Sequence, residues 1–300
     1  MRWVFTILLG AALMAVLVVL VAGVFPGLIW RDLNAVDAGF KPDIAHGAYL
    51  FGIGGCRACH TAPQKDAPLL GGGRVLQTPF GPLSVPNISP DRVAGIGTWR
   101  AVDFLRAMRL GLSPEGQHYY PAFPYPSYTH MTRGDLLDLW AYLRSLPPVS
   151  KAAKRTALPF PFNIRSLIGG WKLLFFSAGK DIIGRNASRG QERGAYLVNG
   201  PGHCAECHTR RNFLGGWVRS DWLAGTGKGP GGKPVPGITG EDKTGLGKWT
   251  QDDIVFALKY GMLPDGDVVG GEMWLVVEQN LAGLSDDDAK AMADYLKSLK

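Results

Sequence analysis

Four cysteines and two histidines form the same pattern at two places in the chain. The sequence contains no other cysteine. The six residues are Cys56, Cys59 and His60 in the string CRACH, and Cys204, Cys207 and His208 in the string CAECH. Two thiols three positions apart on a helical turn lie on one side of that turn. Each pair can therefore react with a single group, and the histidine that follows offers an imidazole ligand to it.

Several kinds of site use paired cysteines, and the adjacent histidine separates them. A redox-active pair needs a βαβ setting, and a zinc site needs four ligands that converge from both pairs. Neither of these, nor two short disulfides, requires a histidine after each pair. The string CxxCH is the attachment signature of haem c. We therefore predict two covalently bound haem c groups, held by thioethers from all four cysteines, with His60 and His208 as the proximal iron ligands.

The chain repeats itself around these motifs, which indicates one module used twice. Matching segments precede the cysteines, follow them at an offset of 150 residues, and recur near the ends of the two halves at an offset of 153. The pairs are 47–50 and 194–197 (GAYL in both), 95–99 and 245–249, and 139–146 and 292–299. Each half is predicted to consist of short helices, the last of which begins at a capping residue, Thr132 or Ser285.

Residues 3–30 contain no charged side chain and are rich in Leu, Val and Ala. At about 1.5 Å per residue, a helix of this length spans a hydrocarbon core of roughly 30 Å. We predict an N-terminal transmembrane helix at 1–30, with Arg2 on the cytoplasmic side and the rest of the chain exported. A cleaved signal peptide is the alternative, although its apolar core is usually shorter, at about 7 to 15 residues.

The net charge of +7 is concentrated between the repeats, where nine Lys or Arg residues accompany only Asp181 and Glu192. We predict a basic linker at 149–189 between domains at 41–148 and 190–300. Such a linker suits an anionic lipid surface or an acidic protein, or serves only as a solvated connection, and nucleic acid is not an expected partner of an exported chain. Its apolar stretch at 166–176 is interpreted as a clasp between the domains, with a partner-docking stripe as the alternative.

Several strings around the haem motifs carry a resemblance to a known family. They are TPFG (78–81), PNISPD (86–91), GIGTW (95–99), YPAFPYPSY (120–128) and GPGHCAECH (200–208). Over residues 43–300 the chain resembles dihaem class I cytochromes c related to the cytochrome subunits of bacterial membrane-bound alcohol dehydrogenases. The resemblance implies an all-α fold, with two tandem class I cytochrome c domains behind an N-terminal transmembrane helix. Those subunits commonly carry three haems, whereas this chain has two motifs.

The resemblance also implies a distal methionine in the loop before the last helix of each domain. In the second domain Met273 occupies that place, and His/Met ligation suits electron transfer because it raises the reduction potential and leaves no open site. In the first domain the repeat aligns Phe123 with Met273, and it aligns Met131 with a core leucine. We take Met131 as the distal ligand of haem 1, with His118 or His130, or a vacant site, as alternatives.

These features predict a dihaem c-type cytochrome that relays electrons in a periplasmic respiratory chain while tethered to the bacterial inner membrane. Its expected partners are a dehydrogenase or quinol-oxidising donor and an oxidase or cytochrome acceptor. The alternative is a dihaem redox enzyme, such as a thiosulfate dehydrogenase, with haem 1 as its active site. That function needs a polar, basic distal pocket, for which the nearby arginines are Arg57, Arg100, Arg106 and Arg109. A haem sensor, the third possibility, would need a signalling domain.

Overall fold

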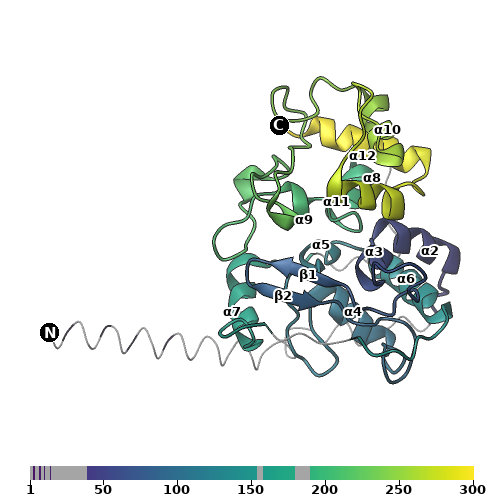
Figure 1. Ribbon diagram of the computed structural model, residues 1–300, viewed down its shortest axis with the longest axis vertical. Coiled ribbons are helices and arrows are strands. Elements are labelled where there is room, and N and C mark those ends of the chain that lie inside the picture. The colour runs from purple at the N-terminus through teal and green to yellow at the C-terminus, as the bar shows by residue number, and fades with distance from the viewer. Residues whose placement is uncertain are drawn as a thin grey trace.

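The computed structural model describes residues 39–153, 158–179 and 190–300, together with four isolated positions before residue 39. The described part is mostly helical and forms two lobes, the N-terminal lobe below and the C-terminal lobe above (Figure 1). Within these residues no helix is both long enough and apolar enough to cross a bilayer. The predicted transmembrane helix at 1–30 lies outside the continuously described ranges.

The two lobes are built from the same succession of helices. The N-terminal lobe contains α2 Ile44–Ile53, α3 Cys56–His60, β1 Val75–Thr78, β2 Gly81–Ser84, α4 Ala101–Leu110, α5 Tyr125–Tyr128 and α6 Arg133–Ser145. Between the repeats lies α7, Ser166–Phe175. The C-terminal lobe contains α8 Gln191–Asn199, α9 Ala205–His208, η2 Arg219–Asp221, η3 Pro230–Gly232, α10 Gln251–Tyr260, α11 Gly271–Val276, η4 Val277–Leu281 and α12 Asp286–Ser298. The repeat seen in the sequence is thus also a repeat of helix order.

A small antiparallel hairpin, β1 and β2, departs from the predicted all-α fold. Thr78 pairs with Gly81 across the turn, and the Thr78 hydroxyl donates a hydrogen bond to the Gly81 carbonyl at 2.7 Å. Gly81 has a φ of +120°, a conformation that favours glycine. Each strand has only four residues, which is too short for a clear alternation of apolar and polar side chains.

In each lobe the first and last helices cross at a glycine. A Cβ on Gly47 of α2 would lie 2.1 Å from the carbonyl oxygen of Asp138 in α6. A Cβ on Gly194 of α8 would lie 1.9 Å from the carbonyl oxygen of Ala291 in α12. No side chain fits at either crossing, so the backbones of the paired helices are in direct contact.

The closing helices α6 and α12 begin at the predicted caps. The Thr132 hydroxyl accepts a hydrogen bond from the N–H of Asp135 at 3.1 Å, and the Ser285 hydroxyl accepts one from the N–H of Asp288 at 3.2 Å. These side chains satisfy backbone donors that the helix itself leaves unpaired. The two cap predictions are therefore confirmed.

At each of these caps a tyrosine from the opposite lobe donates a hydrogen bond, and we call Tyr49 and Tyr196 the exchanged tyrosines. The Tyr49 hydroxyl of α2 donates to the Asp288 carboxylate of the other lobe at 2.6 Å, and the Tyr196 hydroxyl of α8 donates to the buried Asp135 carboxylate. The N–H groups of the two capping residues donate to the same tyrosine hydroxyls, at 3.3 Å for Tyr49 and 3.2 Å for Tyr196. Each lobe therefore supplies one donor to the other, and the contact is reciprocal.

The two aspartates that accept the tyrosine hydrogen bonds have different basic side chains next to them. Arg193 binds Asp288 with two hydrogen bonds of 2.9 and 2.8 Å, whereas its counterpart His46 lies 3.7 Å from Asp135 and 2.9 Å from Asp138. Burial raises the pKa of Asp135. Burial acts on Asp288 in the same direction, but its hydrogen bonds, led by Arg193, outweigh that effect and lower its pKa. Arg193 takes the place of His46 in the other lobe, so a basic side chain on the first helix contacts a carboxylate of the last helix in both lobes.

Tyr196→Phe should destabilise the protein by about 1–3 kcal/mol, because a buried carboxylate would lose a hydrogen-bond donor. Tyr49→Phe should cost less, because Asp288 keeps both hydrogen bonds from Arg193. Urea unfolding of the full chain measures both losses, with Tyr142→Phe in α6 as a control. Equal losses in all three variants would show that the exchanged tyrosines do not stabilise the contact between the lobes.

Candidate functional site

Each CxxCH string forms one short helical turn, as the spacing predicts. In the N-terminal lobe the turn is α3 itself, and in the C-terminal lobe Cys204 has helical backbone angles and leads into α9. The residue before each turn has a positive φ, +63° at Gly55 and +40° at His203. This conformation redirects the chain from the preceding helix into the motif. None of the four cysteines forms a disulfide.

The thiols lie in surroundings unlike those of a redox-active pair. Burial raises the pKa of Cys56 and of Cys204 to about 12, and burial also raises the pKa of Cys59 and of Cys207, the latter to about 11. A reactive or metal-binding thiol has instead a lowered pKa and an electropositive environment. These surroundings suit an uncharged sulfur, which is the state of sulfur in a thioether.

A proline carbonyl orients each motif histidine. Nδ1 of His60 lies 2.8 Å from the carbonyl oxygen of Pro86, and Nδ1 of His208 lies 2.8 Å from that of Pro236. A carbonyl can only accept, so Nδ1 carries the proton and Nε2 keeps its lone pair. Burial lowers the pKa of both imidazoles, that of His60 to about 4. Both rings are therefore neutral, with one nitrogen available to a metal.

Two glycines bring the proline loops within reach of the histidines. The N–H groups of Gly72 and Gly225 donate to the carbonyl oxygens of the motif histidines at 2.7 and 2.8 Å. Both glycines have a positive φ, +70° and +87°. A Cβ on Gly72 would lie 2.6 Å from the carbonyl carbon of Pro86, and a Cβ on Gly225 would lie 2.7 Å from that of Pro236. Any larger residue would push the loop away from the imidazole.

Residue type alone does not single out these prolines and glycines. The string PNISPD at 86–91 entered only as part of a resemblance. A usable signal was present, because PNI at 86–88 and PGI at 236–238 follow the two haem motifs at an offset of 150 residues. A backbone acceptor leaves no mark in residue type, so only this repeated position could have indicated it.

On the distal side, the two lobes differ. Met273 lies in the short helix α11 rather than in the predicted loop, half-buried against the core of the C-terminal lobe. Phe123, its counterpart in the sequence repeat at an offset of 150, is half-buried against the core of the N-terminal lobe. The assignment of Met273 as the distal ligand of haem 2 stays a prediction.

After α4 and α10 the offset between equivalent residues of the two lobes changes by one. Gly111 and Gly261 end α4 and α10 in the left-handed conformation. A Cβ on Gly111 would lie 2.4 Å from the Tyr125 ring, and a Cβ on Gly261 would lie 3.3 Å from the Trp274 ring. Tyr125 therefore takes the place of Trp274 at an offset of 149 rather than 150. Strict alignment at one offset cannot identify the distal residue of the N-terminal lobe.

Met131 is buried in the core of the N-terminal lobe, with 1% of its surface exposed, as its counterpart Leu284 is buried in the other core with 3%. Its carbonyl accepts a hydrogen bond from Arg109 at 2.7 Å. Of the alternatives, His118 is buried, and His130 is exposed on a surface pocket. The assignment of Met131 as the distal ligand of haem 1 also stays a prediction.

The two motifs face each other across the junction of the lobes. A Cβ on Gly55, directly before CRACH, would lie 3.5 Å from Nε2 of His203, directly before CAECH. Tyr128 joins the two sides, because its hydroxyl donates to the Gly54 carbonyl at 2.7 Å and its ring meets the His203 ring edge-on with centroids 5.6 Å apart. Ile53 of α2 is buried in the core of the other lobe. The two CxxCH motifs are therefore neighbours in space, although Cys56 and Cys204 are 148 positions apart in the sequence.

The residues present fit one haem c in each lobe. Two half-buried or exposed thiols without a disulfide partner stand on one turn in each motif, and the neutral imidazole that follows has Nε2 free. The fit is the same in both lobes, down to the proline acceptor at 2.8 Å. Zinc would require the two cysteine pairs to ligate one ion and would leave the histidine after each pair without a role.

Gly72→Ala should displace the Pro86 loop and lengthen its hydrogen bond to His60. We expect a changed midpoint potential and Soret spectrum of haem 1, because the bond to Nδ1 tunes the ligand basicity of the imidazole. Gly116→Ala is the matched control, since Gly116 also has a positive φ, +81°, but a Cβ there would meet nothing within 4 Å. Both variants carry about 1–2 kcal/mol of backbone strain. A haem 1 potential that shifts equally in both would rule out the role of the proline loop.

Met273→Ala should lower the potential of haem 2 by on the order of 100 mV and open its iron to added cyanide, because a thioether ligand would be lost. Met262→Ala, at a half-exposed methionine between α10 and α11, is the control.

Met131→Leu should make haem 1 high-spin if Met131 is its ligand. If Met131 is only a core residue, the variant should lose only about 1 kcal/mol of stability. Near-infrared and magnetic spectra of the ferric protein distinguish these results.

Comparisons with characterised proteins agree with this site, although no protein-family model matches the chain. The chain is 43% identical to a diheme cytochrome c-type protein of Cereibacter sphaeroides over 292 residues, which cover 96% of this chain and 97% of that protein. It is 36% identical over 263 residues to the cytochrome c subunit of the alcohol dehydrogenase (quinone) of Gluconacetobacter polyoxogenes, covering 85% of this chain and 56% of that subunit. It is 36% identical over 261 residues to the fructose dehydrogenase cytochrome subunit of Gluconobacter japonicus, covering 86% of this chain and 53% of that subunit.

The chain thus spans about half the length of these dehydrogenase subunits. It matches the Cereibacter sphaeroides protein over nearly the full length of both chains, and it contains two CxxCH turns. The chain therefore belongs to the dihaem c-type cytochromes related to the cytochrome c subunits of bacterial dehydrogenases.

Proposed function

We propose that this protein is a dihaem electron-transfer subunit that accepts electrons from a dehydrogenase and passes them between its two haems to an acceptor. The observation that carries this proposal is the juxtaposition of the two CxxCH turns across the junction of the lobes, with Gly55 beside His203. Two redox groups attached at neighbouring turns of one chain can exchange electrons without a diffusional encounter.

The residues of each lobe hold and orient the cofactor rather than react. The four cysteines would bind the haem groups covalently, and His60 and His208 would bind the irons through Nε2. The Pro86 and Pro236 carbonyls fix the proton of each imidazole on Nδ1 and make the ring a better ligand. Haem supplies the one-electron chemistry when bound. For electron transfer the protein must bury the haems, fix their iron ligands and hold the two haems close together. No acid, base or nucleophile is needed.

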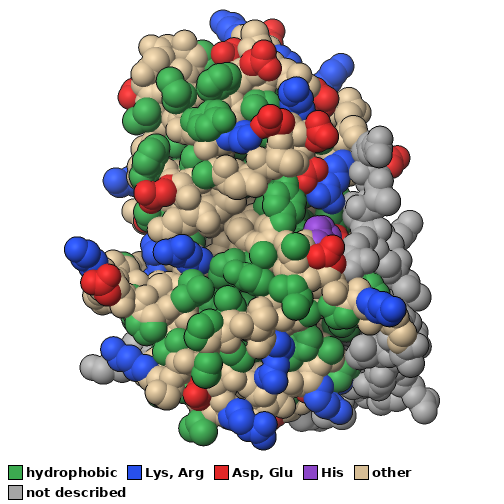
Figure 2. Space-filling view, turned by 90° about the vertical axis from the view of Figure 1, so that its right-hand side faces the viewer, with side chains coloured by type: hydrophobic (Ala, Val, Ile, Leu, Met, Phe, Trp, Pro, Cys, Tyr) green, Lys and Arg blue, Asp and Glu red, His purple; other side chains and the backbone are tan. Residues whose placement is uncertain are grey.

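The names of the relatives support a dehydrogenase as the donor. The cytochrome subunits of alcohol, fructose and gluconate dehydrogenases all resemble this chain at 35–36% identity. The face of the molecule shown in Figure 2 has apolar side chains gathered on the N-terminal lobe next to the junction, with Lys and Arg side chains along its lower edge. An apolar patch with a charged rim is typical of a transient protein contact.

We further propose that the N-terminal segment 1–30 anchors the protein in the bacterial inner membrane with both lobes in the periplasm. An oxidase or another cytochrome is then the acceptor.

The thiosulfate dehydrogenase alternative needed arginines around haem 1, and in the structure these residues are engaged elsewhere or exposed. Arg100 and Arg106 lie 3.0 and 3.9 Å from Asp103 on their own helix α4. Arg109 is buried and donates to two backbone carbonyls, and Arg57 is exposed. The four guanidinium groups therefore do not form a common anion site, and no observation favours that enzyme over electron relay.

Flash reduction of the oxidised full-length holoprotein tests the relay. After less than one electron per molecule is added, we expect the two haems to equilibrate at a rate that stays constant when the protein is diluted about tenfold, because transfer within one rigid body has no encounter step. A rate that falls in proportion to concentration would mean that electrons move between molecules. The proposed relay would then be wrong, even if both haems are bound.

A further inference from the structure

Helix α7 clasps the two lobes with one face, as predicted from the sequence. Lys172 donates to the carbonyls of Leu110 and Gly111 in the N-terminal lobe, at 2.5 and 3.0 Å, and lies over the Tyr125 ring. Trp171 donates to the carbonyl of Leu214 in the C-terminal lobe at 3.0 Å. The only charged side chain of α7 thus points into the protein, where burial lowers its pKa to about 7.

The outward face of α7 is apolar and is not covered by the described part of the chain. Leu173 and Leu174 are 65% and 70% exposed, and Leu167, about two turns before them on the helix, is also exposed. A helix that is apolar on both faces normally lies inside a protein or against a membrane. Burying the cation and exposing the leucines is unfavourable in water, so this arrangement calls for an apolar occupant on the outside.

The exposed apolar surface continues beyond α7. The loop before it exposes Phe160, Phe162 and Ile164, and the loop after α9 exposes Phe213, at 88%, and Leu214. The two loops are connected through Phe80, whose ring centroid lies 5.0 Å from that of Phe162 and whose ring lies next to Gly215. We call this surface the α7 face. Its eight exposed residues are Phe160, Phe162, Ile164, Leu167, Leu173, Leu174, Phe213 and Leu214.

The sequence around α7 carries charges of one sign. No Asp or Glu lies between Asp138 and Asp181, a stretch that contains seven Lys or Arg residues. Besides the inward-pointing Lys172, they are Arg144, Lys151, Lys154, Arg155, Arg165 and Lys180. Apolar and aromatic side chains flanked by basic residues favour the surface of an anionic bilayer.

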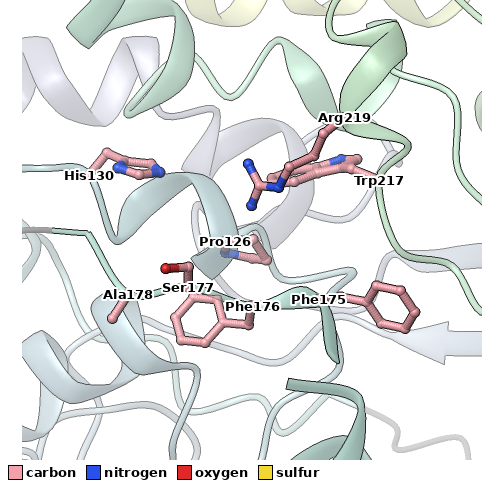
Figure 3. A pocket seen from close by; sticks show the side chains of 8 residues that line it. All are labelled: Pro126, His130, Phe175, Phe176, Ser177, Ala178, Trp217 and Arg219. Carbon is pink, nitrogen blue, oxygen red and sulfur yellow. The ribbon is translucent and has the colours of Figure 1, made fainter. Parts of the chain in front are cut away.

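A pocket of about 400 Å³ adjoins the α7 face. Its wall combines Phe175 and Phe176 after the leucines of α7 with Trp217 and two nitrogen-bearing side chains, His130 and Arg219 (Figure 3). The guanidinium of Arg219 points into the space between these rings. The guanidinium group gives the wall of the pocket a positive charge. The pocket therefore suits an anion attached to an apolar chain.

The length of the chain before the lobes limits how far they can leave a membrane. The uncharged run ends at Trp30, and the described chain begins at Gly39. The eight residues between them reach at most roughly 30 Å when fully extended. If the proposed anchor holds, the lobes stay next to the bilayer, and one of their faces must be turned toward it.

We propose that the α7 face is a second membrane contact, at which its leucines and phenylalanines enter the interfacial layer and the Arg219 pocket accepts the phosphate of an anionic phospholipid. This contact orients the lobes relative to the bilayer. It rests on the proposed anchor for proximity, but it does not depend on electron relay.

Photo-crosslinking to lipid tests this contact on the full-length holoprotein in nanodiscs that contain photoactivatable acyl chains. In discs of phosphatidylglycerol and phosphatidylcholine, the peptides 158–179 and 210–219 should be labelled strongly, and labelling should fall in phosphatidylcholine alone. The double variant Leu173→Ser/Leu174→Ser should reduce the labelling about tenfold, because two partly inserted aliphatic side chains are lost. Arg219→Gln should weaken the preference for phosphatidylglycerol.

Val93→Ser is the control, since Val93 is 96% exposed and lies outside the α7 face; it should leave the labelling unchanged. Labelling of 158–179 no stronger than that around Val93, or crosslinks from the α7 face to a protein instead of lipid in native membranes, would overturn the proposal. Flash reduction of the same variants should show unchanged equilibration between the haems. Loss of lipid contact and loss of electron relay are thus separate results.

Discussion

Backbone contact at two helix crossings sets the geometry of the whole protein. Gly47 and Gly194 let the first and last helices of each lobe touch, because a Cβ at either place would overlap a carbonyl of the partner helix. The crossing fixes α6 and α12 so that their capping residues reach the tyrosine of the opposite lobe. It also fixes the ends of α2 and α8, from which the chain turns into the CxxCH motifs. The attachment sites and the junction of the lobes therefore share one cause.

A second pair of glycines fixes the motif histidines in the same way. Gly72 and Gly225 draw the following loop against each motif, so a proline carbonyl meets Nδ1 of the histidine at 2.8 Å. The imidazole has its tautomer and orientation set by backbone alone, without a side chain that could rotate or titrate. Side chains held in this way keep a fixed geometry, which a preorganised cofactor site requires.

Much of this architecture could be predicted from the sequence, and the missing parts share a physical reason. The repeated CxxCH strings, the helix order and the caps at Thr132 and Ser285 all follow from residue type and spacing. The hairpin was missed because its strands are too short to show a period. The proline acceptors were missed because a carbonyl is common to every residue. The exchange of Tyr49 and Tyr196 was missed because the GAYL strings reveal a repeat but not which lobe each tyrosine contacts. For the distal residue of haem 1, the slip between Tyr125 and Trp274 explains why alignment of the halves gave no single answer.

The exchanged tyrosines have a consequence for the history of the chain. Each lobe offers the same groups to the other: a tyrosine from its first helix, and a cap with its aspartate from its last. Such self-complementary contacts are the mark of an isologous dimer, in which one surface binds a copy of itself about a twofold axis. The protein thus has the form of a symmetric dimer whose two subunits have become one polypeptide. Once joined, the copies no longer had to remain identical, and the first helices now carry His46 in one lobe and Arg193 in the other.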